Sequence, residues 1–108
     1  MYQVNMLEAI SYSDENVLID ELMVTPCSKE VRIVMQKNQV MRDHASDYPI
    51  MLNLLEGVVK LTIEEEEYII KRGELVLLEA ETKHHLDALD NSVLRLTLFT
   101  AAGKSNDE

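Results

Sequence analysis

Apolar residues at every second position are the feature that most constrains how this 108-residue chain can fold. The pattern runs through residues 31–36, 59–64 and 94–98. Successive side chains of a β-strand point to opposite faces of the sheet, so this period predicts strands with one buried face. Three further segments are short and almost continuously apolar, which predicts strands that are buried more fully. They are residues 17–24, 50–55 and 75–78.

The glutamate-rich segment LTIEEEEYIIKRG, residues 61–73, is where a helix competes with strands. Glu, Leu and Lys favour helices, but at helical spacing Ile63 would lie beside two glutamates and Ile70, which gives no continuous apolar stripe. In a hairpin, the four glutamates form a solvated tip between strands at 59–63 and 68–70. We therefore predict a hairpin.

These segments amount to about eight to ten short strands with turns between them and no long helix. The pattern predicts an all-β barrel or sandwich. A chain of 108 residues builds one core but not two, so we expect a single domain. The alternative is an α+β domain in which residues 1–10 form a helix.

The net charge of −10 limits the partners of the protein. Binding to nucleic acid or to an anionic membrane depends on Lys and Arg, and here Asp and Glu outnumber them by 20 to 10. No apolar run approaches the ~20 residues that cross a bilayer, and the first residues do not resemble a signal peptide. Cys27 is the only cysteine, so no intrachain disulfide can form. We expect a cytoplasmic protein that binds neither nucleic acid nor membranes.

Two of the three histidines, His84 and His85, are adjacent. On a strand, His84 shares a face with Leu86 and Ala88, whereas His85 shares the other face with Asp87. Because the first face is apolar, His84 is predicted to point into the barrel and His85 to point to solvent, paired with Asp87. A single histidine on an apolar face is more often a hydrogen-bonded core residue than a ligand, and the alternation leaves both interpretations open.

Residues 40–99 resemble the small single-domain cupins. The segment VMRDHASDYPIMLNLLEG ends at Gly57, as the first cupin motif ends on a glycine. The second motif begins at Gly73, and counting along it reaches His84. The resemblance implies an all-β double-stranded β-helix, or jelly-roll, barrel in a single domain. Its parts would be an amino-terminal arm at residues 1–12, the barrel at 13–100 and a flexible tail at 101–108.

The resemblance also implies a metal site, in which His44 and His84 occupy two of the family's four ligand positions. Ser46 and Ile50 stand where the family has a second histidine and a glutamate. Two imidazoles alone make a poor site, because iron oxygenase centres need a further carboxylate and structural zinc needs four ligands. The candidates for a third ligand are Asn53, Asp43 and Asp47.

Strand parity from Ile50 leaves Asn53 off the inner face unless a bulge intervenes. The expected cofactor is therefore either one divalent transition metal (Fe, Mn, Zn or Ni) or none.

Three functions are compatible with these residues. The first is a barrel that binds a small molecule, and in some arrangements a metal, at a reduced two-histidine site. If the site is catalytic, the resemblance implies dioxygenation, isomerisation or decarboxylation of a small polar substrate. The second is a non-enzymatic ligand sensor, and the third is a dimeric interaction module without metal. The resemblance implies a homodimer in each case.

Overall fold

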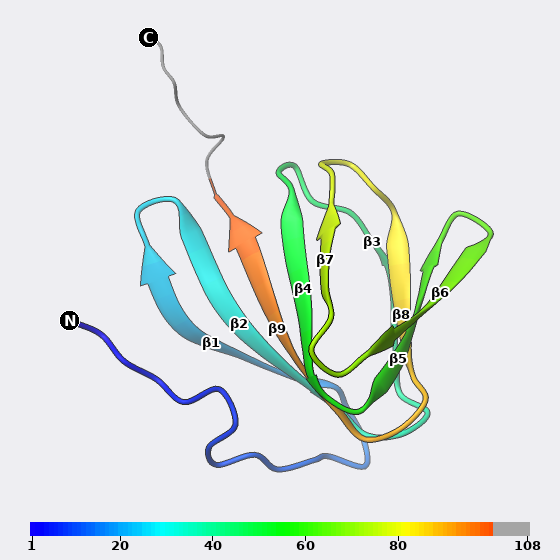
Figure 1. Ribbon diagram of the computed structural model, residues 1–108, viewed down its shortest axis with the longest axis horizontal. Helices are drawn as coiled ribbons and strands as arrows, with labels where there is room; N and C mark the ends of the chain where they lie inside the picture. The colour runs from blue at the N-terminus through cyan, green and yellow to red at the C-terminus, as the bar shows by residue number, and fades with distance from the viewer. Residues whose placement is uncertain (101–108) are drawn as a thin grey trace, which may run out of the picture.

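Nine strands form two antiparallel sheets in the computed structural model, which describes residues 1–100 apart from the side chains of Asp43 and His44 (Figure 1). The five-stranded sheet contains, in spatial order, β1 (Leu18–Thr25), β2 (Ser28–Met35), β9 (Ser92–Phe99), β4 (Ile50–Glu56) and β7 (Leu75–Leu78). The four-stranded sheet contains β3 (Val40–His44), β8 (His84–Ala88), β5 (Val58–Ile63) and β6 (Glu66–Lys71).

The prediction of an all-β jelly-roll barrel is confirmed. Residues 1–10 contain no helix, so the α+β alternative is wrong. Within the described part of the chain there is likewise no helix that could cross a membrane. The predicted flexible tail at residues 101–108 lies outside the described residues.

Inward-facing side chains of both sheets form the core, and they alternate along β4, β5 and β8 as the sequence predicts. Leu61, Leu86 and Leu94 are buried, as expected. Leu96 and Leu98 are only partly buried, because they border a cavity that is described below. Ile63 is also partly buried, because it adjoins the exposed tip of a hairpin. The alternation of residues 59–64 and 94–98 predicts that all three side chains lie on a buried face.

The apolar segments 17–24 and 75–78 do form strands, but the expectation that they are buried more fully is wrong. They correspond to β1 and β7, which are the two edges of the five-stranded sheet. An edge strand has a neighbour on one side only, and Ile19, Leu75 and Leu77 are exposed by 57%, 63% and 62%. A short apolar run in a sequence does not distinguish an edge strand from a central one.

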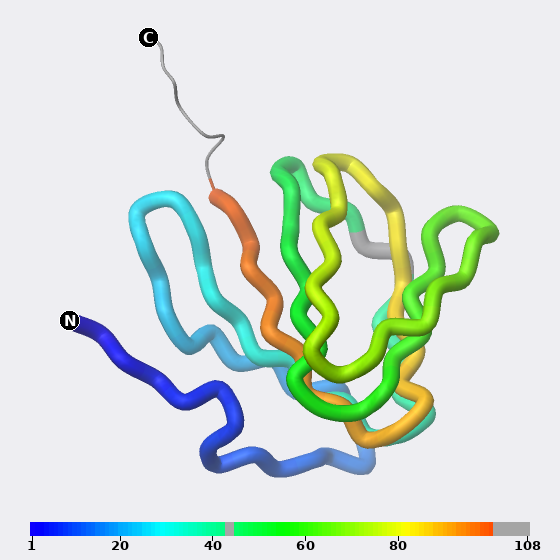
Figure 2. Tube along the Cα trace, viewed as in Figure 1, coloured from blue at the N-terminus to red at the C-terminus, as the bar shows by residue number. Residues whose placement is uncertain are grey.

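The predicted glutamate-rich hairpin is confirmed, with a shorter tip than expected. Ile63 pairs with Glu66, so the connection between β5 and β6 is the two residues Glu64 and Glu65. Glu64 has φ 58°, the conformation that lets a two-residue loop follow the twist of its strands. Figure 2 shows this hairpin and the β1–β2 hairpin at opposite sides of the molecule.

Gly57 lies where the chain leaves β4 in one sheet and enters β5 in the other. Its φ of 96° falls in the left-handed region, which side-chain-bearing residues rarely adopt. A Cβ atom here would also overlap the side chain of Ser92 and the main-chain oxygen of Asn91. Only glycine therefore allows the chain to pass between the sheets at this point.

The amino-terminal arm, residues 1–12, precedes the first strand and contains no strand of its own (Figure 2). Arg32 of β2 holds it: its Nη1 donates to the main-chain oxygens of Met6, at 3.2 Å, and Glu8, at 2.8 Å. Its Nη2 lies 3.4 Å from a carboxylate oxygen of Asp20. Arg32 is consequently buried, although it lies on the strand face that points away from the core.

Glu30 joins β2 to β9 on the same outer face. Its carboxylate accepts hydrogen bonds from Arg95 Nε, at 2.8 Å, and from Thr97 Oγ1, at 2.7 Å. Burial raises the pKa of the Glu30 carboxyl, but the two hydrogen bonds and the Arg95 charge outweigh burial, so its pKa lies below the usual value. The same hydrogen bond raises the pKa of Arg95.

Candidate functional site

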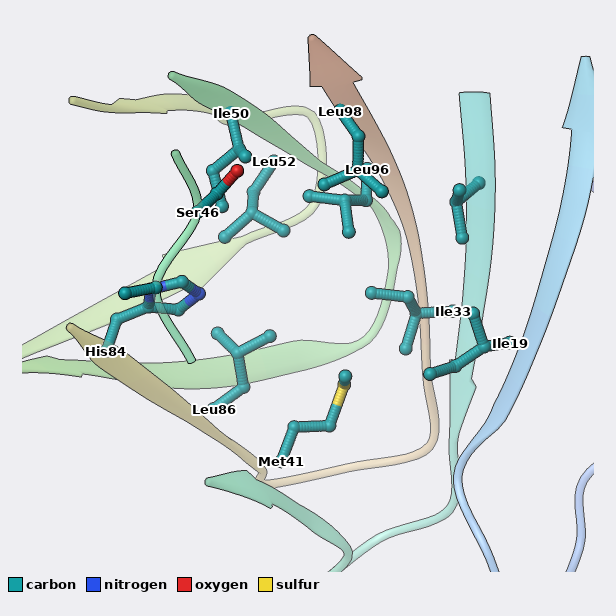
Figure 3. A pocket seen from close by; sticks show the side chains of 12 residues that line it. Ile19, Ile33, Met41, Ser46, Ile50, Leu52, His84, Leu86, Leu96 and Leu98 are labelled. Carbon is teal, nitrogen blue, oxygen red and sulfur yellow. The ribbon is translucent and has the colours of Figure 1, made fainter. Parts of the chain in front are cut away.

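A cavity of about 240 Å³ lies between the two sheets (Figure 3). The five-stranded sheet contributes Ile33, Leu52, Leu96 and Leu98, and the four-stranded sheet contributes Met41 and Leu86. The walls are thus almost entirely aliphatic. The polar side chains among them are His84 and Ser46, which Figure 3 shows at the end of the cavity opposite Ile19.

His84, at the start of β8, points into this cavity and is 8% exposed (Figure 3). Its Nδ1 lies 3.0 Å from the main-chain oxygen of Thr82. A carbonyl oxygen only accepts hydrogen bonds, so Nδ1 of His84 carries a proton and donates it to this bond. The predicted orientation of His84 is confirmed, and this bond is also the kind that a buried core histidine makes.

His85 faces the other side of β8, as predicted. Its Nε2 lies 3.2 Å from Asp87 Oδ2, which is the expected pairing. The side chain is 30% exposed rather than fully exposed, because Asp87 and the neighbouring strands shield it. The two adjacent histidines therefore belong to different environments.

His44 and His84 are direct partners in the ladder between β3 and β8. The main chain thus brings together the two positions that forty residues separate in the sequence. The side chains of His44 and of Asp43, a candidate third ligand, lie outside the described residues. The two-histidine site that the resemblance implies therefore remains a prediction.

The other proposed ligand positions can be located. Ile50 and Ser46 line the cavity, so a butyl group and a hydroxyl stand where the family has a carboxylate and an imidazole. Asn53 alternates with the inward-facing residues of β4, and its Nδ2 donates to the main-chain oxygen of Glu74 at 3.1 Å. Asp47 is exposed. The structure does not bring Asn53 or Asp47 together with His84 in the cavity lining.

The donor set of the described residues does not fit a transition metal. These metals bind through three or more imidazole, carboxylate or thiolate groups. Among the residues that the structure describes, the cavity lining supplies one imidazole, from His84, and one hydroxyl, from Ser46. Among the residues that the structure describes, no group of three or more His, Cys, Asp or Glu side chains could hold an ion.

Sequence reasoning missed Ile19 and Ala45 as parts of this cavity. Ile19 belongs to a segment that was predicted to be buried, and its position at an open edge depends on strand order. Ala45 follows β3 in a loop, where no period predicts which way a side chain points.

A family model of the cupin domain matches residues 31–100. No curated protein matches the chain. Solved structures with the same fold include an RmlC-like cupin protein from Desulfovibrio desulfuricans, at 18% identity and a TM-score of 0.85, covering 93% of this chain and 97% of that one.

A conserved Streptococcus pyogenes protein of unknown function is 19% identical, with a TM-score of 0.81 and coverage of 94% and 90%. A putative mannose-6-phosphate isomerase from Ralstonia eutropha is 14% identical, with a TM-score of 0.81 and coverage of 94% and 100%. At these identities, the likeness to solved structures establishes the fold. The family match spans well over half of the chain, and the protein therefore belongs to the cupin domain family.

Proposed function

We propose that this cupin binds a small, predominantly apolar molecule inside its barrel. The observation that carries the proposal is the aliphatic lining of the cavity between the sheets. Removing apolar surface from water stabilises a complex by about 25 cal/mol per Å², and such surface forms nearly all of these walls. Pockets of this composition are typical sites for small ligands.

The volume of the cavity sets the size of the ligand. A cavity of ~150 Å³ lined by aliphatic and aromatic side chains holds one benzene molecule. The present cavity, at about 240 Å³, is larger by more than half. By proportion, it accommodates about ten non-hydrogen atoms.

This lining supports an apolar ligand over the small polar substrate that the family resemblance implies. A sugar-like molecule would leave most of its hydroxyl groups without hydrogen-bond partners here, which costs about 1–3 kcal/mol for each buried group. Among the described residues of the lining, the polar side chains are those of His84 and Ser46, which lie at one end of the cavity, and they pair with few hydroxyl groups of such a substrate.

Binding of 1-octanol, which has nine non-hydrogen atoms, tests the proposal. In the ¹³C-methyl NMR spectrum of the protein, we expect the probe to shift the resonances of Ile33, Leu52 and Leu98. Leu96→Phe should suppress these shifts, because the larger ring fills the cavity that Leu96 borders. Leu89→Phe is the matched control, since Leu89 is 41% exposed and lies outside the cavity lining. Unchanged cavity methyls in the wild-type protein would refute the proposal.

The same titration separates metal-free binding from metal-dependent binding. Because aliphatic side chains supply the contacts with the ligand, we expect 1-octanol to bind equally after dialysis against EDTA. Elemental analysis of protein purified without an affinity tag supplies the control. Loss of binding together with loss of one bound metal ion per chain would contradict a metal-free site.

We also propose that the protein is a homodimer. Leu75 and Leu77 of the edge strand β7 are exposed by 63% and 62%, and they lie on the same face of the strand. Neighbouring apolar side chains at an open sheet edge are a common feature of surfaces that pair with another chain.

A further inference from the structure

We propose that the cavity and a groove beside it form one two-part site for a neutral amphiphile. The apolar tail, of about eight to ten carbon atoms, lies in the cavity. The head, which carries hydroxyl or amide groups, lies in the groove. This inference rests on the proposed function and specifies the chemical class of the ligand.

The outer groove has a volume of about 580 Å³ and lies between the segment that leads into β1 and the turn that leads into β3. Its walls combine apolar residues with polar side chains, and the polar ones are those of Glu15, Asn16, Asn38, Gln39 and Arg42. The cavity is aliphatic, so the two compartments differ in polarity. A ligand that spans both must be polar at one end and apolar at the other.

Ile19 and Met41 connect the two compartments, because each lines both of them. They come from β1 and β3, which are edge strands of different sheets, so no ladder of hydrogen bonds closes the barrel between them. Ile19 is 57% exposed, and Met41 has an unbranched, adaptable side chain. In the proposed complex, the apolar chain of the ligand enters the cavity between these two side chains.

The polar groups of the groove suit a neutral head. Gln39 is already engaged, since its Nε2 donates to the Ser13 main-chain oxygen at 2.7 Å and its Oε1 accepts from the Gln36 amide at 2.8 Å. Within the described part of the chain, no side-chain hydrogen bond engages the amides of Asn16 and Asn38. Each offers both donors and acceptors to hydroxyl groups.

Charge also favours a neutral head over an anionic one. Arg42 supplies a positive charge to the groove, but Glu15 supplies a negative one. The protein as a whole carries a net charge of −10, which repels anions at long range. Arg42 therefore adds little to the binding free energy of a carboxylate or phosphate head.

The test compares three probes by NMR titration: n-octyl β-glucoside below its micelle-forming concentration, 1-octanol and free glucose. We expect octyl glucoside to shift both the methyl resonances of the cavity and the side-chain amide resonances of Asn16 and Asn38. Its dissociation constant should be about tenfold lower than that of 1-octanol, which corresponds to one or two additional hydrogen bonds. Glucose alone should cause no shifts.

The double variant Asn16→Ala/Asn38→Gly removes the two amides. Glycine is chosen because Asn38 has φ 79°, which glycine adopts without strain. The matched control is Glu64→Gly, at an exposed position of φ 58° in the β5–β6 turn. The double variant should bind octyl glucoside only as tightly as 1-octanol, and its affinity for 1-octanol should be unchanged.

The outcomes separate this inference from the proposed function. Equal affinities for octyl glucoside and 1-octanol in the wild-type protein, with no shift of the asparagine amides, would overturn the two-part site and leave the apolar cavity site standing. Failure of both probes to shift the cavity methyls would overturn both proposals.

Discussion

Replacing Glu30 by Gln is expected to destabilise the fold by about 1–1.5 kcal/mol at neutral pH. The Glu30 side chain is 15% exposed and accepts hydrogen bonds from Thr97 and Arg95. The bond from Thr97, which is 6% exposed, contributes about 1.5 kcal/mol because its acceptor is charged. The Arg95 side chain is 45% exposed, so solvent limits its contribution to about 0.5–1 kcal/mol. The glutamine oxygen retains one neutral hydrogen bond of about 1 kcal/mol.

The size of this loss should depend on pH in a definite direction. The folded-state pKa of Glu30 is lowered from 4.5. Such a carboxylate stabilises the folded state fully above its unfolded pKa, and this contribution is lost as the pH falls through the folded pKa. The wild-type protein and Glu30→Gln should therefore differ most near neutral pH and converge as the pH falls through the lowered folded-state pKa of Glu30.

Urea unfolding at neutral pH and at a second pH below the folded-state pKa of Glu30, located by NMR titration of its carboxyl group, measures both quantities. Glu21→Gln is the matched control, since Glu21 lies 3.5 Å from Lys29 Nζ but both side chains are about half exposed. That change should cost less than about 0.5 kcal/mol. The reasoning is refuted if Glu30→Gln loses no more stability than Glu21→Gln, or if its loss is the same at both pH values.

Alanine at Gly57 should destabilise the fold by about 2–4 kcal/mol, against about 1–2 kcal/mol for alanine at Gly73. Both glycines have positive φ, but a Cβ at Gly57 would meet Ser92, whereas a Cβ at Gly73 would meet no atom. Equal losses of stability for the two variants in thermal unfolding would contradict this packing argument. Sedimentation velocity should show a homodimer at micromolar concentration that Leu77→Glu converts to a monomer. Leu89→Glu, at another exposed leucine, should leave the dimer intact, and a monomeric wild-type protein would rule the proposed dimer out.

The alternation of apolar residues along the sequence predicted the features that are set within a single strand or hairpin. The side on which His84 lies follows from the alternation of β8, and the hairpin at residues 61–73 follows from the absence of a helical stripe. Strand parity also placed Asn53 off the inner face of β4, where the structure has it. Each of these is a local consequence of the two-residue repeat.

Features that depend on the arrangement of several strands could not be predicted in this way. The exposure of Leu75 and Leu77 follows from the position of β7 at a sheet edge, which its apolar sequence does not reveal. The burial of Arg32 requires the amino-terminal arm to pass over β2. Leu96 and Leu98 border the cavity between the sheets, and a one-dimensional pattern of apolar residues cannot distinguish a filled core from a hollow one.

Arg32 anchors the amino-terminal arm through main-chain oxygens, and this has a consequence for how the arm can vary between proteins. Every residue presents the same main-chain carbonyl group, whatever its side chain. The guanidinium of Arg32 therefore recognises the path of the arm and not its sequence. Exposed arm residues such as Tyr2 and Val4 are thereby free to diverge under selection for other purposes. Arg32 itself has no such freedom, because a shorter side chain at that position would leave the carbonyls of Met6 and Glu8 without their donor.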